Sequence, residues 1–141
     1  MQTENSFLKV EGLSKSFKVG SPPVFEGINF EIERGEFVCI IGHSGCGKTT
    51  ILNVLAGLED ATDGYAYMLN REIKGPSLDR GVVFQGHALM PWMTVLQNVA
   101  FAVKSKYPDW SKAKITEHSK KYLEMVGCLL YTSDAADEGL G

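Results

Sequence analysis

The residues best suited to carry out chemistry lie in one glycine-rich segment, Gly42-His43-Ser44-Gly45-Cys46-Gly47-Lys48-Thr49. Its spacing fits the pattern GxxxxGK(S/T) at every fixed position. The glycines allow the backbone to curl, so that successive N–H groups point inward toward an anion. This spacing is typical of a loop that holds the phosphates of a nucleotide.

The side chains of this segment have separate parts in that chemistry. Lys48 supplies a mobile positive charge to the β- and γ-phosphates, the Thr49 hydroxyl is placed to ligate Mg²⁺, and Thr50 can reach another phosphate oxygen. The loop therefore predicts that the chain binds a nucleotide together with Mg²⁺. The loop residues predicted to contact the nucleotide are Gly42, Ser44, Gly45, Cys46, Gly47, Lys48, Thr49 and Thr50.

A strand and a helix must position this loop. The apolar, partly β-branched run FVCII (37–41) predicts a strand buried on both faces. After the loop, a helix is predicted whose apolar face is formed by Ile51, Leu52, Val54, Leu55 and Leu58, with Gly57 at its C-terminal cap. A glycine turn that merely joins strand to helix is the alternative. The correct flanking elements favour a phosphate loop.

The remaining patterns predict an α/β fold. Short strands are expected at 7–10, 28–33, 65–69 and 81–84, the first three contributing to an antiparallel edge that spans 7–33 and 65–75. Asn70-Arg71 predicts a turn. Thr94 and Gln97 form a capping-box pattern that opens a helix through Val103, and Ser111 opens a second helix. The helices begin a helical subdomain at about residue 90.

Composition excludes several other classes. The 141 residues are 44% hydrophobic and 22% charged, which is ordinary for a soluble globular domain. No apolar stretch reaches the ~20 residues that span a bilayer, and the N-terminus has no signal-peptide pattern. The three cysteines and three histidines have no metal-ligand spacing. There is no basic stripe, so no nucleic-acid partner is expected.

Residues 7–127 resemble the N-terminal half of an ABC transporter ATP-binding subunit. Besides the phosphate loop, the resemblance rests on GVVFQ (81–85) and LMPWMTVLQNV (89–99), which look like the Q-loop and the entry to the helical subdomain of import-type ATPases. It implies a P-loop NTPase core in which Gln85 contacts Mg²⁺ or the attacking water. Lys48 and Gln85 are then the candidate catalytic residues, and Thr49 and Gln85 the candidate metal ligands.

The same resemblance implies a site for the base. Phe17 occupies the family's aromatic position, which stacks on adenine, and Val24 lines the same pocket. The alternative for Phe17 is a core residue near a strand end.

Within this family, the segment GEFVCIIGHSGCGKTT is similar to the corresponding segment of the nitrate/sulfonate/taurine group of importers. His43 and KYLEMVG (121–127) favour the nitrate/nitrite/cyanate branch. The implied partners are a second ATP-binding subunit, transmembrane permease subunits and, indirectly, a solute-binding protein, at the cytoplasmic face of a bacterial inner membrane. The alternatives are a sulfonate/taurine importer ATPase, a soluble non-transport ABC ATPase, and a P-loop kinase or GTPase. The last is disfavoured because Phe17 and Gln85 have no counterpart there.

The resemblance also predicts a signature motif (LSGGQ), an apolar strand ending Asp-Glu and a switch histidine, and residues 1–141 contain none of these. The segment CLLYTSDAADE, which starts at Cys128, back-translates to a sequence that looks like a transposon-end adapter. The hypothesis is that 1–127 is the N-terminal part of a nucleotide-binding domain and 128–141 a non-native tail. Such a chain is expected to bind nucleotide weakly, to hydrolyse it negligibly and to leave apolar strand faces bare. A fragment with no cellular role is the remaining alternative.

Overall fold

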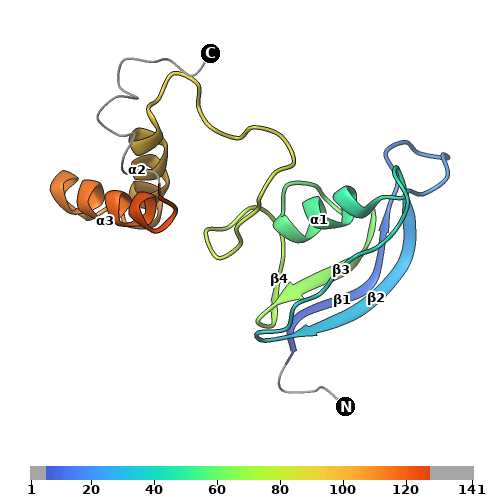
Figure 1. Cartoon of the computed structure of the whole chain (residues 1–141). Helices are drawn as coiled ribbons and strands as arrows, with labels where there is room; N and C mark the ends of the chain where they lie inside the picture. Colours follow the sequence, from blue (N-terminus) through green and yellow to red (C-terminus); the bar gives the residue numbers. More distant parts are fainter. Residues whose placement is uncertain (1–5, 128–141) are drawn as a thin grey trace. The chain divides into compact units, whose positions relative to one another are not determined.

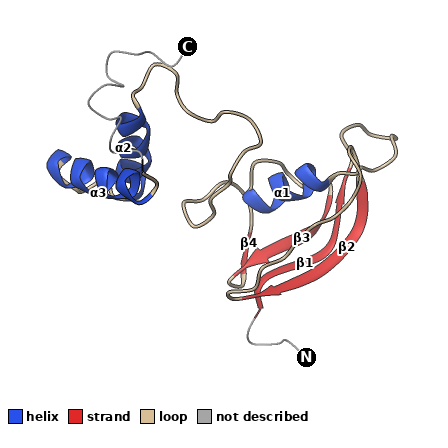
Figure 2. Ribbon diagram, viewed as in Figure 1, coloured by secondary structure: helices blue, strands red, loops and turns tan. Residues whose placement is uncertain are grey.

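The structure is a computed structural model that describes residues 6–127 (Figure 1). The chain divides into two compact units, the first ending at Val82 and the second beginning at Val83. The first unit contains a β-sheet and one helix, and the second contains two helices (Figure 2). The predicted tail, 128–141, lies outside the described residues.

The sheet of the first unit is antiparallel throughout. Its strands are β1 (Ser6–Lys15), β2 (Phe25–Glu33), β3 (Asp63–Met68) and β4 (Arg71–Glu72), in the order β2-β1-β3-β4. In register, Val10 of the central strand β1 lies opposite Phe30 on one side and Ala66 on the other. The predicted antiparallel edge is therefore confirmed.

The core of this unit lies between one sheet face and helix α1 (Lys48–Ala56), which Figure 1 shows beside the strands. Its buried side chains are Leu8, Val10, Leu13, Phe25, Ile51, Val54 and Ala66. Gly57, in the left-handed conformation at φ 78°, caps α1 as predicted. Leu52 and Leu58, however, are about half exposed, so their predicted place on the buried face is wrong.

The turn between β3 and β4 is built from Leu69 and Asn70, which both have positive φ (51° and 60°). Two consecutive left-handed residues match the right-handed twist of the flanking strands, and asparagine tolerates this conformation well. The predicted turn is thus present, one residue earlier than Asn70-Arg71.

Two predicted strands are not formed. Residues 37–41 and 81–84 have no regular secondary structure, and Phe37, Ile41 and Val83 are 90%, 94% and 99% exposed. An extended segment becomes a buried strand only when neighbouring strands bond its N–H and C=O groups and other elements cover its faces. Within residues 6–127 no strand pairs with either segment.

The second unit is a helical hairpin of α2 (Val95–Lys106) and α3 (Lys112–Met125). The predicted capping box is present: the Thr94 side chain accepts from the Gln97 N–H at 3.2 Å, and the Gln97 side chain accepts from the Thr94 N–H at 2.8 Å. Ser111 caps α3, also as predicted. Across residues 6–127, neither of these helices nor α1 combines the length and apolar character needed to cross a membrane.

Candidate functional site

The predicted phosphate loop leads directly into α1. Gly45 and Gly47 have φ values of 79° and 95°, a region that residues with a side chain rarely adopt. Gly47 is also the N-cap of the helix. A Cβ atom added to Gly47 would lie 2.8 Å from Val24 Cγ1. A side chain at this position is therefore disfavoured by the backbone conformation and by the contact with Val24.

The N-terminus of α1 differs from those of α2 and α3. Thr94 and Ser111 cap those helices with side-chain oxygens, whereas Gly47 provides none. The first turn of α1 contains no acidic residue, and in this it matches the other two helices. The first N–H groups of a helix have no partner within it, and they lie at the positive end of its dipole. This end of α1 therefore suits an anion such as a phosphate group.

Lys48 brings a full positive charge to the same place. Its Nζ donates to the carbonyl oxygens of Gly42 at 2.8 Å and His43 at 2.6 Å, and lies 3.5 Å from Cys46 Sγ. The loop thus curls around the ammonium group of its own lysine. A Cβ at Gly42 would come within 2.5 Å of Cys46 Sγ, so a side chain there would require the Cys46 side chain to move. The ammonium can exchange these carbonyls for phosphate oxygens.

The structure brings Val24 to this loop. The Val24 N–H donates to the Lys15 carbonyl at 2.7 Å, and its side chain lies against Gly47. Phe17 is 61% exposed, so the alternative of a core residue is wrong. Its ring is available on the surface of the same unit.

The other predicted residues vary in position. Thr49 and Thr50 lie in the first turn of α1, Thr49 exposed and Thr50 half-buried, and Ser44 is exposed in the loop. Gln85 is exposed and belongs to the second unit, and its contact with Mg²⁺ or water stays a prediction.

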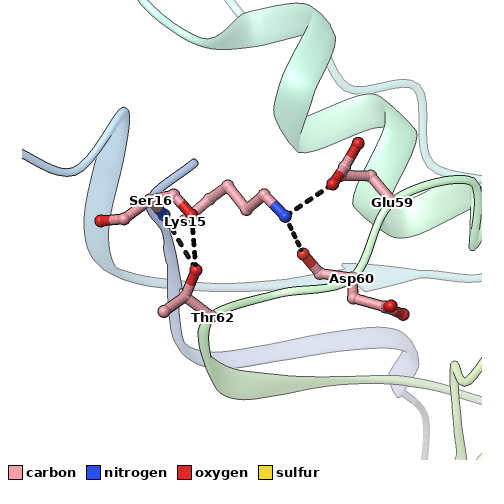
Figure 3. Close-up of polar contacts among 5 residues, drawn as sticks. All are labelled: Lys15, Ser16, Glu59, Asp60 and Thr62. Atoms are coloured by element: carbon pink, nitrogen blue, oxygen red, sulfur yellow. Dashed lines mark hydrogen bonds and ion pairs between the residues drawn. The ribbon is translucent and has the colours of Figure 1, made fainter. Parts of the chain in front are cut away.

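Sequence reasoning did not single out Lys15, which Figure 3 shows with its partners. Although charged, it is only 7% exposed, and its Nζ donates to Glu59 Oε1 and to the Asp60 carbonyl, each at 2.6 Å. A lysine that shares the inward face of a strand with Leu8, Val10 and Leu13 is the signal that could have found it, because charged side chains are rarely buried without a partner.

Comparisons with known proteins fit this arrangement. The family model for ABC transporter matches residues 25–139. The bicarbonate transport ATP-binding protein CmpD of Synechocystis sp. is 41% identical over 128 residues, which cover 89% of this chain and 45% of that protein. The nitrate import ATP-binding protein NrtD of Synechococcus elongatus is 39% identical over 123 residues, covering 86% and 45%. The chain thus spans less than half the length of these relatives.

Solved structures show the same fold. The ATP-binding cassette MJ0796, in a dimeric post-hydrolysis state bound to ADP and Pi, superposes with a TM-score of 0.74 at 30% identity, covering 85% of this chain and 57% of that one. The cbiO1 protein of Clostridium perfringens, part of the ABC transporter complex cbiONQ, superposes with a TM-score of 0.70 at 26% identity. The match covers 87% of this chain and 51% of that one. The fold is that of a P-loop ATP-binding cassette, and the chain belongs to the ABC transporter family.

Proposed function

We propose that this chain binds ATP through the loop from Gly42 to Thr49, as part of an ATPase that powers import through a membrane permease. One observation carries the proposal: the Lys48 ammonium is enclosed by its loop at the uncapped N-terminus of α1. A cation beside the N–H groups at the N-terminus of a helix is the complement of a polyphosphate.

The residues present also suit Mg²⁺. This ion prefers oxygen ligands and is usually held by few protein groups together with substrate phosphates. Residues 6–127 contain no group of three or more His, Cys, Asp or Glu side chains that could hold a metal ion. The exposed Thr49 hydroxyl, in the first turn of α1, is the proposed oxygen ligand. Gln85 stays a second candidate from the sequence. Bound Mg²⁺ would neutralise charge on the β- and γ-phosphates.

The base would stack on the exposed ring of Phe17, with Val24 beside it. Two contacts support this placement. The Val24 side chain lies against Gly47 of the phosphate loop, and its N–H donates a hydrogen bond to Lys15, in the strand that leads to Phe17. Aromatic stacking needs an accessible ring face, which the 61% exposure of Phe17 provides.

For the whole protein we propose hydrolysis of ATP by a pair of ATP-binding subunits, at the cytoplasmic face of the membrane. The solute would be a small inorganic anion, taken up with the help of a solute-binding protein. Nitrate, nitrite and cyanate remain the specific candidates. The relatives named for bicarbonate and nitrate support this class. Residues 1–127 alone would form the N-terminal part of the domain, with negligible turnover.

Calorimetric titration of the chain with MgATP tests the binding proposal. The Lys48→Ala variant should bind at least about tenfold more weakly, because a charge-assisted hydrogen bond contributes ~1.5–3 kcal/mol. A Lys9→Ala control removes a lysine from the outer face of the sheet and should bind like the original chain. Equal affinity for the original chain and Lys48→Ala would overturn the proposal.

A further inference from the structure

The ammonium group of the buried Lys15 of β1 has three partners. Two are the Glu59 side-chain oxygen and the Asp60 carbonyl oxygen (Figure 3), and each lies 2.6 Å from the Lys15 nitrogen. The third partner is the ring of Phe17, whose centroid lies 5.1 Å from the ammonium nitrogen.

These contacts join parts of the chain that are distant in sequence. Glu59 and Asp60 follow α1, while Lys15 ends β1, so the ammonium ties the segment after the helix to the segment that carries Phe17. Next to Lys15, the Thr62 hydroxyl accepts from the Ser16 N–H at 2.9 Å and donates to the Ser16 carbonyl at 3.1 Å (Figure 3). The residue before Phe17 is thereby held on both of its backbone groups.

The backbone of Lys15 also relates the aromatic ring to the phosphate loop. Its carbonyl accepts from the Val24 N–H at 2.7 Å, and Val24 in turn touches Gly47. Phe17, Lys15, Val24 and Gly47 thus form a continuous series of contacts within the first unit.

We propose that Lys15 is a positioning residue for purine binding: it holds the Phe17 ring from one side and leaves the exposed remainder of the ring for the base. The inference rests on the proposed function, in which Phe17 stacks on adenine. A cation near a ring attracts its π-electrons. It therefore leaves the open face poorer in electrons, and this favours stacking on an electron-rich purine.

Two ligands separate this role from a general loss of structure. MgATP uses both the base site and the phosphate loop, whereas magnesium-bound inorganic triphosphate uses the loop alone. Replacing Lys15 by methionine keeps an unbranched side chain of similar length and removes the charge. The Lys15→Met variant should bind MgATP about 3- to 10-fold more weakly, the range of a partly desolvated cation–π contact. Its affinity for triphosphate should stay within about twofold.

The matched control is Lys9→Met, the same substitution on the outer face of the same strand, which should leave both affinities unchanged. Lys15→Arg, which keeps a cation over the ring, should restore most of the MgATP affinity. In a chain that already carries Phe17→Ala, Lys15→Met should cause no further loss, because the ring through which Lys15 acts is gone.

The outcomes distinguish the two proposals. If Phe17→Ala leaves the ratio of MgATP to triphosphate affinity unchanged, the proposed adenine stacking fails. If Phe17→Ala lowers that ratio and Lys15→Met does not, stacking stands and the role of Lys15 is overturned. Should Lys15→Met fail to fold, Glu59→Ala decides, since it removes the charged anchor of the ammonium and leaves Lys15 in place. An unchanged ratio in Glu59→Ala overturns the inference, and a ratio lowered at least about twofold supports it.

Discussion

Val24 lies directly against Gly47, so closely that a Cβ atom at residue 47 would come within 2.8 Å of Val24 Cγ1. One residue stands just before β2 and the other at the N-terminus of α1. Their contact joins the antiparallel sheet to the glycine loop that precedes α1, and it makes the loop conformation depend on a residue 23 positions away in the sequence.

Gly47→Ala should therefore lower both stability and nucleotide affinity. The substitution adds a steric conflict to a backbone conformation, φ 95°, that costs a residue with a side chain ~1–3 kcal/mol. Gly20→Ala is the control, because Gly20 has a similar φ of 81° but open space around it. Urea denaturation and MgATP titration of both variants measure the difference. A Gly47→Ala chain that matches Gly20→Ala in both would refute the steric argument.

The Asn98 side chain should be needed to hold the segment that precedes α2 in its folded conformation. Its side-chain N–H groups contact the carbonyls of Met90, Met93 and Thr94 at 3.0–3.2 Å, and its oxygen accepts from the Met90 N–H at 2.8 Å. Asn98→Asp places a carboxylate against three carbonyl oxygens, and we expect a loss of ~2–4 kcal/mol in the free energy of unfolding.

The control for this change is Asn70→Asp, the same substitution in the exposed β3–β4 turn, which should alter stability by less than ~0.5 kcal/mol. Thermal unfolding followed by circular dichroism compares the two variants. Equal melting temperatures for both would show that the Asn98 contacts are not needed.

The contribution of Lys9 to the free energy of unfolding should depend on pH at high pH. Its hydrogen bond to Glu11, at 2.6 Å, and the nearby carboxylates of Glu11 and Glu31 raise the pKa of its ammonium above the ordinary value of 10.5. A raised pKa means that the folded state binds the proton more tightly than the unfolded state. The stabilisation is thus fully present below about pH 10.5 and is lost as the pH rises through the folded-state pKa.

The measurement is the difference in unfolding free energy between the original chain and Lys9→Met, at pH 8 and at pH 11.5. This difference should shrink at the higher pH. A difference that stays constant would mean that Lys9 gains nothing from its carboxylate neighbours.

The hypothesis of a non-native tail predicts a result at the level of DNA. Reading the source DNA across codon 127 should show a frame that departs from CLLYTSDAADE and continues toward a signature motif and an apolar strand ending Asp-Glu. Genomic DNA that encodes residues 128–141 as they stand would refute the hypothesis.

Features set by neighbouring residues could be read from the sequence. The capping box of Thr94 and Gln97, the Ser111 cap and the left-handed Gly57 each depend on residues within one helical turn. The same holds for the glycine loop, whose curl around Lys48 involves contacts no more than six residues apart.

Tertiary structure alone decided the rest. The run from Phe37 to Ile41 has the composition of a buried strand, yet a strand forms only where partners satisfy its backbone, and residues 6–127 provide none. Conversely, the contact of Lys15 with Glu59 joins residues 44 positions apart, and no local pattern specifies such a pair. The sequence by itself determined the curl of the glycine loop and the helix ends, because their interactions are local. The place of Lys15, Val24 and the exposed Phe17 ring followed only from the packing of distant segments.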